Sequence, residues 1–522
     1  MLHVRQFIIV SALFIVSSIC YPQENRITTL DSVGVVAYWH GIEYRPMHEM
    51  AMKDRVWIQE GFKSGTSQIG VSQVWGGGKF QPSQGMDKLK QFRFETEGNT
   101  RWNKTDFWGK FAYQRDREDS TALRHQTRWN EDAPYYYASI RKNMYSRETY
   151  KLDAAIQQQF IDGQLPVTLG LDYRLGSHYS NNDPRGDISD MNLTINLAVG
   201  HRVQQLTYHL HGIIGYGSER VGVGYKNDKN NSGLERPEYT NWIMEGYGTM
   251  NSKTSNIRYE GFVNRRGAGV NLKYETGNNG SVFFNGRYVR ENQSFKETNS
   301  TPSTYQILMD YNKDIVMGEL LWTSPLQQHH VFTISLDGRI ERGADGLYSL
   351  GGATGQNNYV YQRDQVWAKA NYSFAKSTLN ANIGINDLNR EDGKAGNKLT
   401  YTQVKLGLGY SHSFPLKKIF VLRSELNYAF QHALNHNLVM PLINESDVAR
   451  RIIHHDYLYQ SASVHEWNTR WTFSDNRPRR NWSVNVQVDY QRRGEFESQE
   501  LSSIYQPGKD WFIGKLGLSY AF

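Results

Sequence analysis

The chain has 522 residues, with 59 Lys and Arg against 52 Asp and Glu, a formal net charge of +7 and a mean hydropathy of −0.65. This net charge is small for the length and does not indicate nucleic acid as a partner. A membrane-spanning helix needs about 18 consecutive apolar residues, and no internal segment approaches that length. Aromatic residues nonetheless make up 13% of the chain, as 33 Tyr, 22 Phe and 13 Trp. A chain that is hydrophilic on average but rich in aromatic residues is typical of a protein with a lipid-facing apolar band, aromatic residues at the membrane interfaces and a water-filled lumen.

Residues 1–20 are predicted to be a cleavable signal peptide. His3 and Arg5 precede an apolar run from Phe7 to Val16, which is too short to span a bilayer. We therefore expect export across the inner membrane. Cys20, the only cysteine, has two interpretations: the acylated residue of a lipoprotein, or a residue removed by cleavage just after it with Ser18 at minus three. We favour cleavage, which would leave no thiol for a disulfide or a thiolate metal site.

Residues 21–65 precede the strand pattern and are treated as an N-terminal segment. They could fill a lumen as a small plug, extend into the periplasm, or form a loosely packed N-terminus. Met47, His48, Met50 and Met52 would suit Cu(I) by ligand type. Methionines that pack against a barrel wall are the commoner explanation, so we predict no metal site.

From residue 66 to residue 522 the chain shows period-two alternation again and again, most strictly from Trp482 to Tyr490. Each such run predicts a strand with one apolar face. The pattern predicts an all-β fold, a transmembrane antiparallel up-and-down β-barrel of about 18 strands, with 16 as the alternative. The predicted strands lie near 66–75, 88–97, 105–116, 148–161, 166–179, 191–200, 204–226, 256–277, 280–291, 303–323, 329–341, 356–375, 378–390, 400–412, 418–431, 456–473, 481–493 and 509–522.

The connections between these strands alternate between short and long. The short turns are near 162–163, 277–280, 324–325, 375–377, 414–416 and 474–480. Longer polar stretches lie near 181–190, 227–237, 291–302, 343–358, 390–397, 431–455 and 491–506. Short periplasmic turns and long external loops are the asymmetry of outer-membrane barrels, so we expect the C-terminus on the side of the short turns.

Seven charged residues fall on the strand positions opposite the apolar ones and are predicted to line the lumen: Arg287, Asp337, Arg423, Glu425, Glu466, Arg470 and Asp489. Charges of both signs could set up a field that selects solutes. They could equally pair across the lumen and brace it, which is the role we favour.

No constellation of residues indicates catalysis or a cofactor. His454, His455 and Asp456, near a predicted external loop, are the candidates for a rim active site, but adjacent histidines on a strand point to opposite faces. His329 and His330 by a short turn are interpreted in the same way. No phosphate loop and no zinc spacing is present. We therefore predict no catalytic residues, no metal and no cofactor.

The last predicted strand carries apolar or aromatic residues at every second position back from the terminus, including Phe522, Tyr520 and Leu518. This segment resembles the closing strand of bacterial outer-membrane β-barrels, in which the terminal signature is recognised by the barrel assembly machinery. The size and the Tyr-, Asn- and Gly-rich style look like outer-membrane barrels of Bacteroidota, several families of which have no assigned activity. The resemblance implies location in the cell outer membrane, contact with its lipid, and the assembly machinery as a partner.

The function that we predict is an outer-membrane channel or transporter for hydrophilic or amphipathic solutes. The alternative is a non-conducting accessory or scaffold barrel of a larger outer-membrane complex with protein partners, and a rim-active enzyme is the least favoured. Packing of the lumen separates the first two. A lumen filled by residues 23–65 or by inward loops would favour the accessory role.

Overall fold

The computed structural model describes residues 44–522 apart from short gaps at 63, 128–129, 131, 232–234, 254–256, 278–279, 299–304, 325–329, 348–356, 417–418, 442–446, 476–480 and 497–505. The predicted signal peptide and Cys20 lie outside these residues. Within them, no helix is long and apolar enough to cross a membrane.

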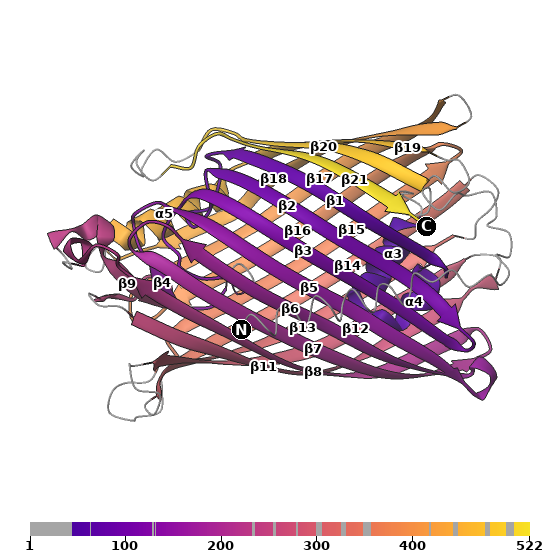
Figure 1. The fold of residues 1–522 in the computed structure, drawn as a ribbon, viewed down its shortest axis with the longest axis horizontal. Coiled ribbons are helices and arrows are strands. Elements are labelled where there is room, and N and C mark those ends of the chain that lie inside the picture. The colour runs from indigo at the N-terminus through magenta and orange to yellow at the C-terminus, as the bar shows by residue number, and fades with distance from the viewer. Residues whose placement is uncertain are drawn as a thin grey trace.

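The described chain forms one sheet of 18 antiparallel strands that closes on itself (Figure 1). Each strand pairs with its neighbour in sequence, and the first pairs with the last through registers such as Val71 opposite Leu518. The strands are β1 (Thr66–Gly78), β2 (Lys88–Trp102), β3 (Thr105–Thr121), β5 (Asn143–Phe160), β6 (Leu165–Ser180), β7 (Arg185–Val203), β8 (Leu206–Gly224), β11 (Ile257–Glu275), β12 (Ser281–Thr298), β13 (Tyr305–Thr323), β14 (His330–Leu347), β15 (Tyr359–Phe374), β16 (Ser377–Asp392), β17 (Asn397–Leu416), β18 (Phe420–Val439), β19 (Val464–Asp475), β20 (Asn481–Arg493) and β21 (Asp510–Ala521). The predicted barrel is confirmed.

The outer face of the barrel is apolar where the strands alternate most regularly. Leu210, Ile214 and Leu408 are 62%, 61% and 68% exposed, although each lies between inward-facing neighbours in its strand. Aromatic side chains stack along this face, as Tyr372 does on Phe374. Exposed aliphatic side chains bordered by aromatic rows are what a lipid-facing surface requires.

A short N-terminal segment lies inside the barrel at the end where the chain terminates (Figure 1). It consists of α3 (Arg45–Lys53), the 3₁₀ turn η1 (Arg55–Trp57) and α4 (Ile58–Gly61). Pro46 stands in the first turn of α3, where its missing N–H costs nothing, and the Asp54 carboxylate accepts from the Val56 N–H at 3.5 Å to start η1. We call residues 44–62 the plug. Its buried apolar side chains meet small and aromatic residues of the wall, the cluster being Met50, Ala51, Val56, Trp57, Ile58 and Phe62 with Trp108, Ala155, Ala198, Phe283 and Leu321.

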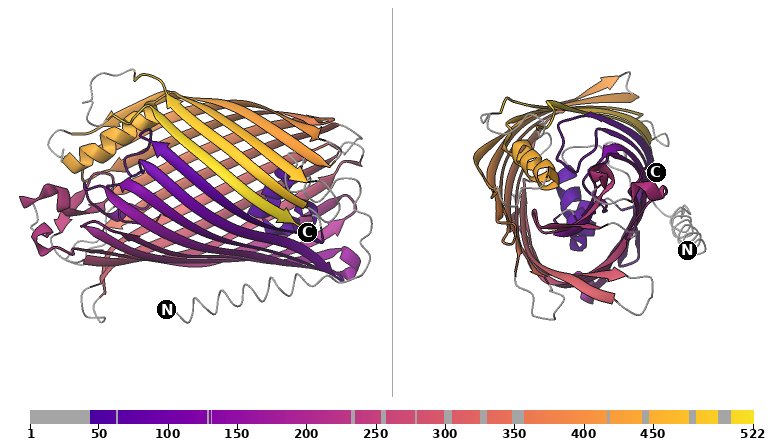
Figure 2. Two further views of the ribbon diagram at one scale, coloured as in Figure 1. Left: turned by 45° about the horizontal axis from the view of Figure 1, so that its top comes forward. Right: turned by 90° about the vertical axis from the view of Figure 1, so that its left-hand side faces the viewer.

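The opposite mouth of the barrel is covered by segments that belong to the long connections. β4 (Tyr135–Ala138), β9 (Asn241–Glu245) and β10 (Met250–Lys253) form a three-stranded sheet, and α5 (Asp447–Ser461) packs beside it. Viewed along the barrel, these elements lie within the ring of strands (Figure 2). Short 3₁₀ turns at η2 (Ile161–Gly163), η3 (Asp228–Asn230) and η5 (Pro237–Tyr239) complete the connections.

Several predicted boundaries were wrong, for two reasons. The strands continue beyond the apolar band, so that β6 ends at Ser180 and β7 begins at Arg185, where a loop at 181–190 was predicted. The predicted loop at 431–455 and strand at 456–473 divide instead into the end of β18, helix α5 and β19 from Val464. Outward side chains above the band are polar, which removes the alternation. Within α5, apolar residues recur at helical spacing, as Val448, Ala449, Ile452 and Ile453 do.

Candidate functional site

Lys53 at the end of α3 bridges the plug to two wall strands. Its Nζ lies 2.8 Å from Glu319 Oε1 on β13 and 2.6 Å from Asp337 Oδ1 on β14. Burial alone would lower the pKa of Lys53, but the two carboxylates outweigh it and raise the pKa above its ordinary value. The ammonium is therefore charged throughout the neutral range and joins the plug to the wall as an ion pair.

Arg55 makes a second and more deeply buried connection. Its side chain is 7% exposed, and Nη2 donates to Asp172 Oδ1 on β6 at 2.8 Å. The guanidinium also lies 4.5 Å above the ring of Trp108 and donates to the Ala51 carbonyl at 3.2 Å. Nearby, an ideal Cβ on Gly170 would lie 3.2 Å from Arg55 Cγ and 3.5 Å from Arg55 Cβ, so the plug backbone at Arg55 packs closely on β6.

Hydrogen bonds hold the rest of the plug against the wall. Trp57 Nε1 donates to Asn285 Oδ1 at 2.6 Å, and Gln59 Nε2 donates to Asp106 Oδ2 at 2.5 Å. Asn271 Nδ2 donates to Asp54 Oδ2 at 2.7 Å. The segment is thus fixed by a compact apolar patch surrounded by polar contacts to wall strands.

The methionines of the plug take the structural role that we favoured. Met50 is fully buried in the apolar cluster, with Met47 and Met52 packed against its edge. His48 Nε2 is 3.5 Å from Glu97 Oε1, and burial lowers the pKa of His48 despite this carboxylate. Within the described ranges, no three His, Cys, Asp or Glu side chains are grouped to hold a metal ion.

A cavity of about 330 Å³ lies directly beside the plug. Three cations and three carboxylates surround it, together with amides and one indole: Lys53, Asp54, Asn285, Arg287, Glu319, Asp337, Arg339, Gln365 and Trp367. The ring of Trp367 lies flat on β16, because a Cβ at Gly384 would be 2.3 Å from two of its ring carbons. The cavity thus offers balanced charge, hydrogen-bonding groups and one aromatic side chain.

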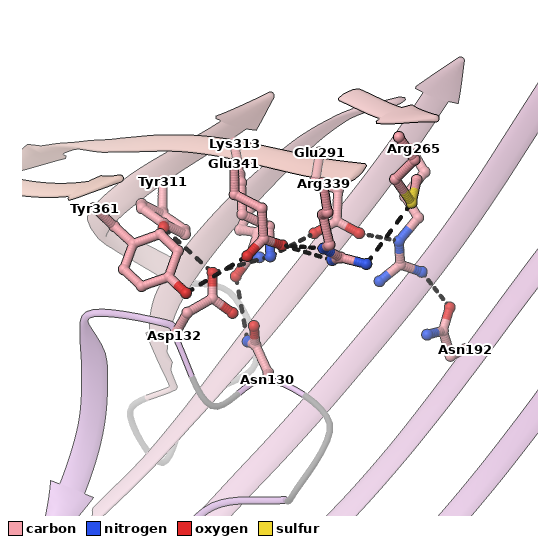
Figure 3. A network of polar contacts seen from close by, with 12 residues as sticks. Asn130, Asp132, Asn192, Arg265, Glu291, Tyr311, Lys313, Arg339, Glu341 and Tyr361 are labelled. Atoms are coloured by element: carbon pink, nitrogen blue, oxygen red, sulfur yellow. Dashed lines mark hydrogen bonds and ion pairs between the residues drawn. The ribbon is translucent and has the colours of Figure 1, made fainter. Parts of the chain in front are cut away.

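A buried polar network fixes the covering segments to the wall above this cavity (Figure 3). Lys313 Nζ on β13 lies 2.9 Å from Asp132 Oδ2, in the connection before β4, and 3.4 Å from Glu291 Oε2 on β12. Burial would raise the pKa of Asp132, but the adjacent Lys313 ammonium outweighs it and the pKa is lowered. Arg265 pairs with the other side of Glu291.

The network extends to the cavity through Arg339, which lines it. Arg339 Nη2 lies 2.5 Å from Glu341 Oε1, and the hydroxyl of Tyr361 is 3.5 Å from the other oxygen of Glu341. Beyond it, buried tyrosines close the mouth, among them Tyr135, Tyr137, Tyr259, Tyr311 and Tyr359. The cavity therefore lies between the plug and a second, separately built closure.

The seven predicted lumen residues all lie on the strand faces opposite the exposed apolar side chains, but they do not form one group. Arg287 and Asp337 reach the cavity, where Arg287 Nη1 donates to the Lys53 carbonyl at 3.2 Å. The others pair with neighbouring groups. Along the wall these contacts are Arg423 with Glu425 at 3.7 Å, Glu466 with Lys405 at 2.5 Å, Arg470 with Gln487 at 2.9 Å, and Asp489 with Gln487 at 2.9 Å. Glu425 also pairs with Arg45 of the plug at 3.3 Å. Whether these charges select a solute stays a prediction.

The candidates for a rim active site lie on a helix, not on a strand as predicted. His455 Nε2 is 2.8 Å from the Gln81 carbonyl, and Asp456 Oδ1 accepts from the Ser83 N–H at 2.8 Å. Both side chains thus tie α5 to the β1–β2 connection. His454 lies on the same helix. His330 contacts the Tyr372 hydroxyl at 2.8 Å on the outer face, and His329 lies outside the described residues.

The C-terminal signature residues lie on the outer face of β21 or directly after it. Leu518, Tyr520 and Phe522 are all exposed, and Tyr520 stacks on Phe522. Their recognition by the assembly machinery stays a prediction.

Sequence reasoning missed most of the cavity residues. Glu319 and Arg339 stand on inward positions of strands that were predicted, so strand parity could have found them. Lys53, Asp54 and the plug geometry have no periodic signal, because the position of the 19-residue plug is set by its contacts with the surrounding wall.

Residues 56–522 match a family described as "Family of unknown function (DUF6850)". The chain belongs to this family. None of the curated proteins compared with it matches. The match covers the whole barrel and begins inside the plug, at Val56.

Several solved structures resemble the chain at low identity. One is the FrpB iron transporter from Neisseria meningitidis, with 10% identity and a TM-score of 0.42 over 88% of this chain and 82% of that one. The outer membrane transporter YddB from Escherichia coli gives 8% and 0.41, over 88% and 81%. The ferric yersiniabactin uptake receptor FyuA from Yersinia pestis gives 7% and 0.40, over 88% and 80%. These values are too low for the names to indicate what this chain does.

Proposed function

We propose that this protein is a gated outer-membrane conduit for small hydrophilic or amphipathic solutes, closed at rest by the plug on one side of its cavity and by the covering segments on the other. The observation that carries the proposal is the charge-balanced cavity between the two closures. An 18-stranded barrel is wide enough for an aqueous channel, and inward polar side chains suit solutes that lose little hydration on entry.

The connections of the plug suit a closure that can be displaced. Lys53 is 43% exposed, and ion pairs at such sites contribute only about 0.2–1 kcal/mol each. The buried part of the plug is one compact apolar patch around Trp57 together with the buried Arg55. Movement of this segment would join the cavity to the adjacent mouth without any change in the barrel strands.

A non-conducting accessory barrel is the second candidate, and the covering segments favour it. β4, β9 and α5 bury a large aromatic cluster at the other mouth, and a closure of this size is expensive to open. On this alternative the lumen is permanently filled and the outer surfaces serve protein partners.

Conductance in planar bilayers separates the two. We expect the full chain to be silent or to open rarely, and the double variant Lys53→Gln/Arg55→Gln to open in frequent steps. Lys405→Gln is the matched control, because it removes a lumen cation that pairs with Glu466 and touches no plug residue. Silence of the plug variant, with the barrel shown to be folded by its heat-modifiable band, would favour the accessory role.

Location in the outer membrane, a Bacteroidota origin and assembly through the C-terminal strand are part of this proposal. The predicted export signal, the outward apolar band and the aromatic terminus support the location and the assembly route, and the size and the Tyr-, Asn- and Gly-rich composition support the origin. Fractionation of cell envelopes tests the location directly.

A further inference from the structure

The outer face of the barrel changes from apolar to charged in a single step. On four neighbouring strands the last exposed apolar or aromatic side chains are Tyr288, Val316, Ile340 and Val366, which are 44%, 47%, 45% and 49% exposed. Two residues further toward the covered mouth, on the same face, stand Arg290, Asp314, Arg342 and Asp364. Such a boundary marks the depth at which hydrocarbon gives way to lipid headgroups.

Most charges in this row are matched by a neighbour of opposite sign. Asp314 is the cross-strand partner of both Arg290 and Arg342. Arg342 forms a two-pronged pair with Asp364, with contacts of 2.5 and 2.8 Å. From β13 to β15 each charge in the row thus has a neighbour of opposite sign.

The row ends in two arginines that face each other. Arg266 on β11 is the direct cross-strand partner of Arg290 on β12, and both side chains are exposed on the outer face. Like charges directly opposite in a sheet repel. Within the described residues Arg266 makes no ion pair, and the Asp314 carboxylate is 3.9 Å from Arg290 Nε, beyond hydrogen-bonding distance.

In the part of the chain that the structure describes, no carboxylate forms an ion pair with either arginine at less than 3.9 Å, and the surroundings add amides. Asn264 and Asn292 form the next outward pair above it, and Arg290 Nε donates to Asn292 Oδ1 at 3.4 Å. Ile214, 61% exposed, is the partner of Arg266 on its other side. The place combines two guanidinium groups and two amides with an apolar neighbour at headgroup depth.

From this arrangement we infer that Arg266 and Arg290 bind the phosphate of a membrane lipid headgroup in the leaflet at the covered mouth. A phosphate placed between the two guanidinium groups would relieve their repulsion and accept hydrogen bonds from both. The acyl chains of the same lipid would lie along Ile214 and the apolar band beneath it. A free phosphate ion shares the headgroup chemistry but gains nothing from that apolar surface.

The test uses the full-length protein in detergent micelles, titrated with phosphatidylglycerol and followed by native mass spectrometry. We expect Arg266→Gln/Arg290→Gln to weaken the tightest bound lipid roughly tenfold, from the loss of two basic groups at the headgroup level. Arg342→Gln is the matched control at the same depth, because this arginine has its own carboxylate, and it should leave the lipid affinity unchanged. The single variants Arg266→Gln and Arg290→Gln carry the test if the double variant does not fold.

Three outcomes would overturn the inference. Equal lipid binding by the double variant and the unmodified protein would show that the arginine pair is not the site. An equal loss in Arg342→Gln would indicate a general effect of surface charge. Displacement of phosphatidylglycerol by millimolar sodium phosphate would assign the site to free phosphate instead of lipid.

Discussion

Replacement of Lys313 by Met should release the covering segments from the barrel wall. The Lys313 side chain is 8% exposed and lies between Asp132 and Glu291, which are 18% and 10% exposed. Without its ammonium, Glu291 keeps Arg265 as a partner, but Asp132 loses the cation with which it forms an ion pair and remains close to the Glu291 carboxylate. Loss of one partner from a buried ion pair costs about 3–5 kcal/mol, and we take the lower limit because Asp132 stands on a connection that can move into water.

The expected result is a local opening and not loss of the barrel. About 3 kcal/mol corresponds to roughly a hundredfold rise in the open population of the segment around β4. Hydrogen exchange of a peptide that covers Tyr135–Ala138 measures this opening, with a strand peptide from β20 as the internal reference. Lys405→Met, which breaks a lumen pair of comparable length far from β4, should leave that exchange unchanged.

The pH dependence gives a second, independent check. The pKa of Asp132 is lowered in the folded protein, so this group stabilises the closed state above its ordinary pKa of about 3.9 and loses that contribution as the pH falls further. In Lys313→Met the Asp132 carboxylate keeps the Tyr311 hydroxyl at 3.3 Å and the influence of Arg390, but its paired ammonium is gone while Glu291 remains, so protonation relieves repulsion. The ratio of opening in the variant to opening in the unmodified protein should therefore shrink on acidification. An unchanged exchange rate, or a ratio that grows with acid, would refute the reasoning.

Three further predictions concern other parts of the molecule. Burial and the nearby Arg147 lower the pKa of His125 to about 3, so the closure around β4 should become less stable as the pH falls from about 6.5 toward that value. Hydrogen exchange measures this loss of stability, and His125→Asn should remove its dependence on pH. Gly384→Ala should lower the free energy of unfolding by about 1–3 kcal/mol because the new methyl group displaces Trp367. The heat-modifiable band should then be lost at a lower temperature. Gly318→Ala, which adds a methyl group in open space, should leave that temperature unchanged. Phe522→Ala should reduce the amount of folded barrel in cell membranes but leave refolding of the purified chain unchanged. Leu516→Ala, at an equally outward position, is the control. If Phe522→Ala reduced both the folded barrel in cells and refolding of the purified chain, recognition by the assembly machinery would be contradicted.

The barrel was predictable from the sequence because lipid and lumen impose opposite requirements on successive residues. From Trp482 to Tyr490 every second side chain is apolar or aromatic and lies on the outer face, and the alternation identifies β20 directly. The same reasoning placed Asp337 and Arg287 on the inner face, where the structure has them beside the cavity. Strand ends were missed because both faces are polar above the apolar band, as at Asp187 and Asp190 of β7.

The two closures were not predictable in the same way. Residues 447–461 carry an apolar stripe at helical spacing, but this stripe is short and lies in a long polar connection. The plug depends on contacts between residues far apart in sequence, such as Lys53 with Asp337 and Arg55 with Asp172. No local pattern encodes such pairs, so the cavity between the closures becomes visible only once the barrel is assembled.

The central claim, that displacement of the plug opens the conduit, is tested most directly by locking the plug with a disulfide. The double variant Arg55→Cys/Gly170→Cys, made with Cys20→Ser, places two Cβ positions 3.5 Å apart, at the short limit of the distances that disulfides span. Its conductance is measured in one bilayer before and after addition of a reductant, with each single cysteine variant treated in the same way. The account predicts silence of the double variant while the disulfide is intact and channel openings after reduction, whereas neither single cysteine variant should change its conductance when the reductant is added. Equal conductance in the oxidised and reduced states would contradict it.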